Sequence, residues 1–378
     1  MRRLPTGINP FRPGAGATPP LLAGRDRELA VADRKLGELA SGRVPPRGLL
    51  LYGPRGHGKT VLLGEIARRS HARGLRAGIV PPSAFRDRET LARRLALLVE
   101  ATAPRLTGVQ LGPVGASVES VARSDDVPEL FLRWAGEPGG PLVVLVDEAQ
   151  TLSVDAGQVF LDAIQLAADE ELPFLLVFAG TPDAPRRLRQ IRTNSERAFR
   201  RLRIGRLHRS DTRRALEEPA LRAGRPFTPS GVRPLARRSQ DYPFFVQLLG
   251  SAAWAAAEHA GRGGIRESSV REAIVSAREE IQTFYLERFQ EARSRGVERL
   301  LQPLALAMRQ SARRLSDEGI RSLLRSAAPR GTDESRARMI ETLSDLGVLW
   351  ETLDGGWEMG IPSFGDYILD RDGPARPL

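Results

Sequence analysis

The sequence predicts an α/β protein with a parallel five-stranded sheet. Five short apolar runs follow one another, and the first four are near-continuously apolar, as is typical of parallel strands buried on both faces. Helical patterns separate the runs, and this alternation predicts an α/β sandwich. The Gly- and Val-rich stretch 104–126 is compatible with a hairpin insertion that touches a partner, and the sequence leaves its role open. The expected strands are RGLLLY at 47–52, AGIV at 77–80, PLVVLV at 141–146, PFLLVFA at 173–179 and RLRIGRL at 201–207.

The composition indicates a folded chain without disulfides. With 378 residues, of which 41% are hydrophobic and 27% charged, the chain is long enough for two or three domains. Its net charge of +11 comes almost entirely from arginine, so it is weak evidence for nucleic-acid binding. The absence of cysteine excludes disulfides and thiolate metal sites, and the four histidines have no ligand spacing.

The N-terminal segment is not expected to be a signal peptide. Pro and Gly residues interrupt the first 20 residues, which we expect to form an extended arm. No other stretch approaches the apolar length that a membrane-spanning helix requires. We therefore expect a cytoplasmic protein without a membrane partner.

A phosphate-binding loop is predicted at GPRGHGKT, residues 53–60, because this stretch satisfies GxxxxGK[ST] between the first strand and an amphipathic helix. The glycines allow a tight turn whose N–H groups surround phosphate oxygens, and His57 needs only its backbone there. Lys59 is expected to reach the β- and γ-phosphates of ATP, and Thr60 to bind Mg²⁺ through its hydroxyl. The residues expected around the nucleotide are Gly53, Pro54, Arg55, Gly56, His57, Gly58, Lys59, Thr60 and Val61.

Two acidic residues follow the third expected strand. In PLVVLVDEAQ, Asp147 ends the buried strand, where its carboxylate can hold Mg²⁺ through water. Glu148 comes next and is expected to polarise the attacking water as the catalytic base. One expected strand, AGIV, separates these acids from the phosphate-binding loop along the chain. This order and the acidic pair indicate a P-loop NTPase three-layer sandwich with an extra central strand.

Thr181 and several arginines are further catalytic candidates. Thr181 ends the fourth strand in AGTPD, where its hydroxyl could contact the attacking water or the γ-phosphate, although Gly-Thr-Pro is also ordinary turn chemistry. The next segment is expected to be a basic helix, from which an arginine could reach a neighbouring subunit's nucleotide. In so Arg-rich a chain, most arginines are solvated surface groups. The candidates are Arg197, Arg200 and Arg201.

Seven segments together resemble an AAA+ type ATPase, of the branch that includes archaeal-type ATPases, replication-initiator relatives and STAND switches. The resemblance covers about residues 10–290 and is carried by LLAGRDREL, the phosphate-binding loop, DEAQ, AGTPD, SERAFRRLRIGRL, PALRAGRPF and DYPFFVQLLG. It implies that Gly24 and Arg25 pack against adenine. It also implies the phosphate and magnesium roles of Lys59 and Thr60, a metal-partner role for Asp147, a base role for Glu148 and a first-sensor role for Thr181.

The expected helical lid departs from this family pattern. In many initiator relatives an arginine of the lid touches the γ-phosphate, whereas DYPFFVQ places Pro243 and two phenylalanines around that position. Hydrolysis is therefore expected to be slow or to be completed by another subunit. We expect Phe244, Phe245 and Trp254 to be core residues of the lid, and residues 265–296 to form a long connecting helix.

The last eighty or so residues predict a winged helix. Three helix patterns, two of them starting at the N-cap candidates Ser316 and Asp333, precede a hairpin signal at Asp354-Gly355-Gly356. The third helix of such a domain enters a DNA major groove, but such domains also serve as packing or protein-binding modules, and this wing tip is acidic. The sequence therefore leaves open whether this domain binds double-stranded DNA or a protein partner. If the domain binds DNA, Arg336 and Arg338 are expected to face the groove, and Arg325 and Arg330 to lie near the DNA backbone.

Together these expectations describe a molecular switch that uses ATP and Mg²⁺. Its expected parts are an arm (1–20), a P-loop ATPase core (21–207), a helical lid with a connecting helix (208–296) and a winged-helix domain (297–378). A neighbour's arginine implies a homo-oligomer, at least with nucleotide bound. The first hypothesis is an ATP-hydrolysing AAA+ switch that acts on DNA. The alternatives are a STAND-like signalling or defence switch whose C-terminal domain binds protein, and a nucleotide-binding scaffold with negligible turnover.

Overall fold

The computed structural model describes residues 7–14, 16–85, 87, 89–95, 141–352 and 354–371. The chain forms two compact units that alternate along the sequence. Arg25–Tyr52 and Lys59–Ile204 form one, here called the sheet unit; Met1–Gly24, Gly53–Gly58 and Gly205–Leu378 form the other, the helical unit. Within the described residues, no helix combines the length and apolarity that crossing a membrane would demand.

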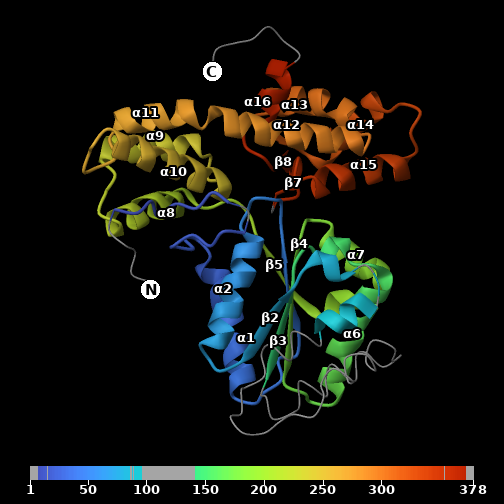
Figure 1. The fold of residues 1–378 in the computed structure, drawn as a ribbon. Helices are drawn as coiled ribbons and strands as arrows, with labels where there is room; N and C mark the ends of the chain where they lie inside the picture. The colour runs from blue at the N-terminus through green and yellow to red at the C-terminus, as the bar shows by residue number, and fades with distance from the viewer. Residues whose placement is uncertain are drawn as a thin grey trace. The chain divides into compact units, whose positions relative to one another are not determined.

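In the part of the chain that the structure describes, the sheet unit is built on five parallel strands (Figure 1). Their order is β2-β3-β4-β1-β5. β4 therefore lies between β1, which precedes the glycine-rich loop, and β3, which precedes Asp147, and this confirms the predicted extra central strand. The strands are β1 (Gly48–Tyr52), β2 (Arg76–Val80), β3 (Leu142–Val146), β4 (Phe174–Gly180) and β5 (Phe199–Arg203).

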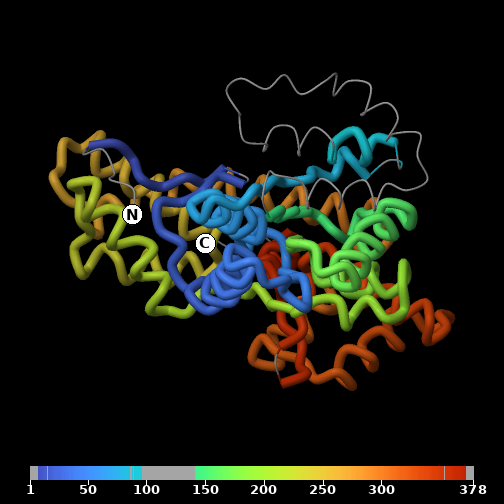
Figure 2. The backbone as a smooth tube through the Cα atoms, turned by 90° about the horizontal axis from the view of Figure 1, so that it is seen from below, coloured from blue at the N-terminus to red at the C-terminus, as the bar shows by residue number. Residues whose placement is uncertain are grey.

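Helices cover both faces of this sheet (Figures 1 and 2). Alternate strand residues belong to different cores: Leu49 and Val143 pack in one, and Leu50 and Val144 in the other. The apolar runs are continuous because both faces are buried, as the sequence pattern predicts. The helices are α1 (Asp26–Ala40) and α2 (Lys59–His71) on one face, and α6 (Val154–Asp169) and α7 (Ala184–Ile191) on the other.

Some element boundaries differ from the expected ones. β5 ends at Arg203 rather than at 207, because the last main-chain bond to β1 runs from Ile204 N to Tyr52 O, where β1 ends. The expected basic helix is divided into α7 and the single turn η3 (Ser195–Arg197). The stretch 104–126 lies entirely outside the described residues.

The first part of the helical unit consists of the helices that the sequence assigns to a lid. Trp254 and Phe245 are buried and Phe244 is partly buried, which confirms them as core residues. The expected long connecting helix is two helices, because Ala277 has ψ of −4° and interrupts the helical backbone. The helices are α8 (Arg209–Arg222), α9 (Pro229–Arg238), α10 (Pro243–His259), α11 (Glu267–Ser276) and α12 (Arg278–Ser294).

In the described residues after Gly296, the chain forms four helices, one more than predicted, and a three-stranded antiparallel sheet in the order β6-β8-β7. Ser316 caps α14 as predicted, since its hydroxyl accepts a bond from Gly319 N at 3.0 Å. Thr332, not Asp333, caps α15, because the extended backbone at Thr332 brings its hydroxyl to Ser335 N. The elements are the turn η4 (Glu298–Leu300), α13 (Leu301–Gln310), β6 (Arg314–Leu315), α14 (Asp317–Ala327), α15 (Asp333–Asp345), β7 (Leu349–Glu351), β8 (Trp357–Met359) and α16 (Phe364–Arg371).

Candidate functional site

The glycine-rich loop Gly53–Gly58 has a backbone suited to binding an anion. Gly56 has φ of 74° and Gly58 has φ of 86°, in the left-handed region that glycine adopts without a steric penalty. In turns of this kind, successive main-chain N–H groups point towards a common centre, where they can surround phosphate oxygens. Helix α2 begins at Lys59, so the N–H groups of its first turn follow the loop directly in the chain.

The side chain of His57 is packed inside the helical unit. It is 1% exposed, and its ring meets the ring of Tyr242 edge-on with centroids 5.1 Å apart. Its Nδ1 lies 3.0 Å from the carbonyl oxygen of Arg55. The ring of His57 therefore has a packing role against Tyr242, in addition to whatever its backbone binds. Of its neighbours in the loop, Pro54 is also buried.

Tyr242, the residue before α10, holds the loop through its hydroxyl. The phenol donates a hydrogen bond to the carbonyl oxygen of Arg55 at 2.8 Å. Burial raises the pKa of Tyr242, so the hydroxyl stays protonated and remains a donor. A Cβ atom on Gly56 would lie 2.6 Å from the phenol's Cζ and still nearer its oxygen. Only glycine therefore fits at position 56.

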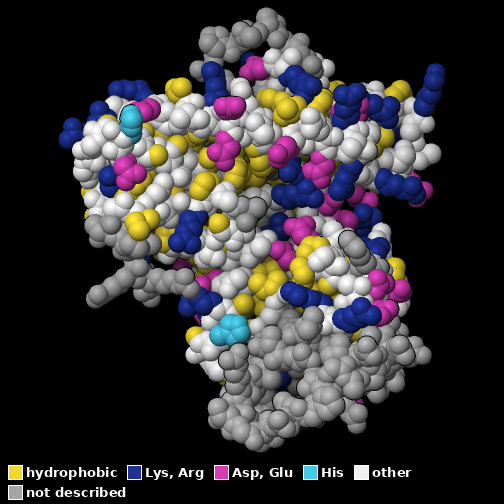
Figure 3. Space-filling model, viewed as in Figure 1, with side chains coloured by type: hydrophobic (Ala, Val, Ile, Leu, Met, Phe, Trp, Pro, Cys, Tyr) yellow, Lys and Arg dark blue, Asp and Glu magenta, His cyan; other side chains and the backbone are white. Residues whose placement is uncertain are grey.

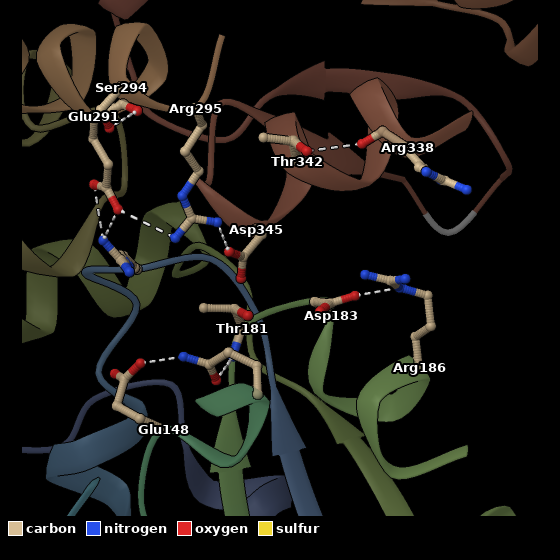
Figure 4. Close-up of polar contacts among 12 residues, drawn as sticks. Glu148, Thr181, Asp183, Arg186, Glu291, Ser294, Arg295, Arg338, Thr342 and Asp345 are labelled. Atoms are coloured by element: carbon tan, nitrogen blue, oxygen red, sulfur yellow. Dashed lines mark hydrogen bonds and ion pairs between the residues drawn. The ribbon is translucent and has the colours of Figure 1, made fainter. Parts of the chain in front are cut away.

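The guanidinium of Arg55 is bound by α12. It donates to both carboxylate oxygens of Glu291, at 2.8 and 2.9 Å. Glu291 also accepts a bond from Arg288 at 2.6 Å and lies 3.7 Å from Arg295, which pairs with Asp345 at the end of α15 (Figure 4). A chain of ion pairs thus runs from the glycine-rich loop through α12 to α15.

Thr60 and Asp147 meet in the sheet unit although 87 positions separate them. Thr60 follows Lys59 in the first turn of α2, and its hydroxyl donates to Asp147 Oδ2 at 2.7 Å. Asp147 comes directly after β3, is 8% exposed, and accepts a bond from Glu148 N at 2.9 Å through Oδ1. Lys59 is 6% exposed, and Val61 is half-buried. The two predicted magnesium ligands are therefore adjacent.

This pair of side chains suits Mg²⁺. A hydroxyl and a carboxylate are hard oxygen donors, which Mg²⁺ prefers. In the part of the chain that the structure describes, no cluster of three or more His, Cys, Asp or Glu side chains could hold a metal ion alone. Mg²⁺ commonly binds one or two protein ligands and completes its shell with phosphate oxygens and water. Thr60 and Asp147 fit that pattern.

Glu148 is held through both its backbone and its side chain. Its φ is 52°, which is uncommon for a residue other than glycine. Its carbonyl accepts bonds from the N–H and the hydroxyl of Thr151, both at 2.8 Å. Its carboxylate accepts a bond from Gln150 Nε2, and Gln150 Oε1 accepts one from Thr181 N at 2.9 Å (Figure 4). The structure therefore brings Glu148 and Thr181 together through Gln150.

The arginines proposed to act on a neighbouring subunit lie on the surface of the sheet unit. Arg197 is exposed in the turn η3. Arg200 and Arg201 are exposed on β5, an edge strand, and Arg201 lies 3.5 Å from Glu196. Their exposure leaves them accessible to a second chain.

The two residues expected to pack against adenine lie at the junction before α1. Gly24 has φ of 70°, and a Cβ atom there would lie 2.8 Å from Asp211 Oδ2 of α8. Arg25 is the N-cap residue of α1 and is 6% exposed. The position of Gly24 therefore requires glycine for two reasons, its backbone conformation and its close neighbour.

Sequence reasoning missed three residues that shape the site: Gln150, Tyr242 and Glu291. Gln150 is part of the DEAQ segment, so its position two residues after Glu148 was a visible signal. Tyr242 and Glu291 are 187 and 236 positions from Arg55, and no local pattern links them to it.

The strand order, the glycine-rich loop and the contact between Thr60 and Asp147 define a P-loop ATPase fold of the AAA+ class. Residues 21–188 match the AAA ATPase domain family. ATPases of this class use nucleotide and usually Mg²⁺. Among curated proteins, none matches the sequence.

Solved structures share the fold. Orc1 from Aeropyrum pernix, solved in complex with DNA, has 19% sequence identity and a TM-score of 0.51, and the match covers 94% of each chain. A RuvB variant from Thermotoga maritima has 14% identity and a TM-score of 0.50, over 93% of this chain and 97% of that one. At these identities the likeness establishes the fold alone.

Proposed function

We propose that the protein binds ATP with Mg²⁺ and hydrolyses it to ADP and phosphate, as a nucleotide-dependent molecular switch. The observation that carries this proposal is the 2.7 Å hydrogen bond between Thr60 and Asp147, with Glu148 next in the chain. A hydroxyl on the helix that follows the glycine-rich loop and a carboxylate after a central strand are the side chains that P-loop NTPases use for Mg²⁺.

Each residue has a role that follows from its position. The N–H groups of the loop and of the first turn of α2 bind phosphate oxygens, and the ammonium of Lys59 binds the β- and γ-phosphates. Thr60 and Asp147 hold Mg²⁺, which neutralises phosphate charge when bound. The carboxylate of Glu148 orients the attacking water and accepts its proton, and Thr181 contacts that water or the γ-phosphate.

Steady-state phosphate release with MgATP tests the proposal. Glu148→Gln keeps the shape of the side chain but removes the base, so we expect phosphate release to fall about 10²-fold or more while MgATP binding is kept. Glu171→Gln is the matched control, because Glu171 is an exposed glutamate with nearly the same backbone conformation, φ of 53°. Glu171 precedes β4, so it lies at the opposite end of the parallel strands from Glu148. Hydrolysis that survives Glu148→Gln unchanged would show that this assignment is wrong. Binding of MgATP without turnover by the unaltered chain would favour the scaffold alternative.

Assembly into a homo-oligomer is part of the proposal. Exposed arginines on η3 and β5 support it, because a guanidinium from a neighbour can stabilise charge on the transferred phosphoryl group. Mixing the Glu148→Gln chain with a chain that lacks Arg197, Arg200 and Arg201 tests this point. Each supplies what the other lacks, so we expect the mixture to regain phosphate release that neither shows alone. A mixture no more active than its parts contradicts a role in trans.

Double-stranded DNA is the second part of the proposed function, through residues 297–378 as a winged-helix domain. The helices α13, α14 and α15 with a small antiparallel sheet support this assignment, and the fold resembles that of Orc1, which was solved in complex with DNA. Basic side chains gather over the region of α14 and α15, with acidic ones among them (Figure 3). Arg325 and Arg330 are exposed there.

The arginines of α15 differ in accessibility. Arg336 donates to the carbonyl oxygens of Ala328 and Pro329, and its side chain is only 16% exposed, so it is used within the domain. The side chain of Arg338 is 72% exposed, and its one ion-pair partner among the described residues is Glu334 on the same helix. Of the two residues expected to enter the groove, Arg338 is therefore the better candidate.

Duplex-DNA affinity at several salt concentrations tests this role. Arg338→Ala is expected to weaken binding by about 1–3 kcal/mol or to reduce the salt slope by about one. Arg271→Ala on α11 is the matched control, because that arginine is 71% exposed and also pairs with a glutamate four residues earlier. Equal loss in both variants would indicate a general charge effect. No affinity for DNA would favour the alternative in which this domain binds protein.

A further inference from the structure

Gln150 lies in the turn η2 (Ala149–Thr151), and both ends of its carboxamide are engaged. Its Nε2 donates to a carboxylate oxygen of Glu148, and its Oε1 accepts the N–H of Thr181 at 2.9 Å (Figure 4). The side chain of Gln150 thus connects Glu148, which precedes η2, to Thr181, the first residue after β4.

The polarity of this connection is determined by its partners. A carboxamide has one donor end and one acceptor end. Because the N–H of Thr181 requires the acceptor end, the donor end must face the carboxylate of Glu148. A glutamate at position 150 could accept from Thr181 but would place a second carboxylate against Glu148, and an apolar side chain could make neither bond.

Gly180 supports the same conclusion from the opposite side. A Cβ atom at position 180 would lie 2.8 Å from Gln150 Oε1 and 2.5 Å from the Cβ of Ala184. Glycine at the end of β4 therefore leaves the space that the carboxamide occupies. The backbone of Glu148 is bound by Asp147 and Thr151, and Gln150 restrains the remaining part, the carboxylate.

We propose that Gln150 is a positioning residue for hydrolysis, which holds the Glu148 carboxylate in one orientation and ties it to the end of β4 at Thr181. The inference rests on the proposed function, in which Glu148 orients the attacking water. Gln150 binds one oxygen of the Glu148 carboxylate, and the proposed function assigns the other oxygen to the attacking water. Without this bond the side chain has several rotamers, so the base is correctly placed only part of the time.

Gln150→Met is the test variant, because methionine has a similar length and volume but no carboxamide. We expect kcat to fall about tenfold or more, while the Kd for MgATP changes by less than about twofold, since Gln150 is assigned no phosphate contact. Gln165→Met is the matched control. Gln165 is an exposed residue of α6 that donates to Asp169 at 3.0 and 3.1 Å, so the control breaks the same kind of bond outside the site.

A second readout does not depend on turnover. Hydrogen exchange at the amide of Thr181 reports the bond to Gln150 Oε1, so Gln150→Met should accelerate it, and Glu148→Ala should do so to a smaller extent by releasing the carboxamide. Gln150→Glu separates the two bonds: its carboxylate still accepts from Thr181, so exchange stays slow, but it repels Glu148, so kcat falls. A general structural defect would not produce this separation.

The inference is supported by loss of kcat with unchanged MgATP affinity together with faster exchange at Thr181. It is overturned if Gln150→Met leaves kcat unchanged or raises it, or if exchange at Thr181 is not altered. If the unaltered protein binds MgATP without turnover, the proposed hydrolysis fails, and the role of Gln150 in it fails as well. The exchange measurement then shows separately whether the link between Glu148 and Thr181 exists.

Discussion

The phenol of Tyr242 donates a hydrogen bond to the carbonyl oxygen of Arg55 at 2.8 Å. It occupies the space into which a side chain at Gly56 would extend. Tyr242 is fully buried, so it cannot turn away to make room for another side chain. The conformation of the glycine-rich loop therefore depends on a residue of the helical unit as well as on its own glycines.

Gly56→Ala is expected to destabilise the protein by about 2–4 kcal/mol, because it adds both left-handed backbone strain and a clash with the Tyr242 ring. Gly261→Ala is the matched control. It has φ of 62° and nothing within 4 Å of a new Cβ atom, so it measures the backbone cost alone, about 1 kcal/mol. Denaturant unfolding of both variants gives the difference. Equal losses would show that the contact with Tyr242 is unimportant.

Lys59→Met is expected to weaken MgATP binding by about tenfold or more, because it removes the one ammonium assigned to the phosphates. Calorimetric titration with a slowly hydrolysed ATP analogue measures the affinity. Lys59→Arg should also bind poorly, since the planar guanidinium is wider than the ammonium it replaces. If Lys59→Arg binds as well as the unaltered chain, charge alone is sufficient at this position.

Glu291→Gln is expected to lower the free energy of unfolding by about 1 kcal/mol, since it leaves the guanidinium groups of Arg55, Arg288 and Arg295 facing one another without the shared carboxylate. The loss should shrink at high salt because these groups are partly exposed. Glu280→Gln, an exposed residue of the same helix, serves as the control. A loss that does not depend on salt would contradict an electrostatic origin.

Glu65 on α2 gives a pH dependence of stability. Its hydrogen bond with Arg68, and a further one with Arg69, hold the pKa of Glu65 below its ordinary value of 4.5. A lowered folded-state pKa contributes stability above pH 4.5, and that stability is lost as the pH falls through the folded-state value. Glu65→Gln should therefore cost about 1–2 kcal/mol at pH 7. Urea unfolding between pH 3 and pH 7 should show this difference narrowing towards the acid end, and a constant difference would contradict it.

Much of the sheet unit could be predicted from the sequence, because each strand is specified by a short, local run of apolar residues. Leu49 and Leu50 follow one another in a single apolar run, and the two faces of a doubly covered sheet require that pattern. The meeting of Thr60 with Asp147 was also predictable, because motif order places Thr60 after β1 and Asp147 after β3, and the carboxyl ends of parallel strands lie at the same edge of a sheet. The end of β5 was not, since it depends on where β1 stops, and a strand ends when its partner does.

The contacts around the glycine-rich loop show where sequence reasoning stops. Tyr242 and Glu291 reach Arg55 only after the helical unit has folded, so their importance is not contained in any window of sequence. Gln150 is close to Glu148 in the chain, but its use depends on the left-handed backbone of Glu148 and on the absence of a side chain at Gly180. Neither condition can be read from the letters DEAQ.

The segment Gly53–Gly58 belongs to the helical unit, but along the chain it lies between β1 and α2, which belong to the sheet unit. A gene fragment ending near Ile204 would encode the whole nucleotide-binding signature and yet omit Tyr242 and Glu291. Recombination could not transfer this ATPase domain alone to another protein and keep its loop intact. The two units are therefore expected to be inherited together, and substitutions at positions 56 and 242 are expected to accompany each other in descendants.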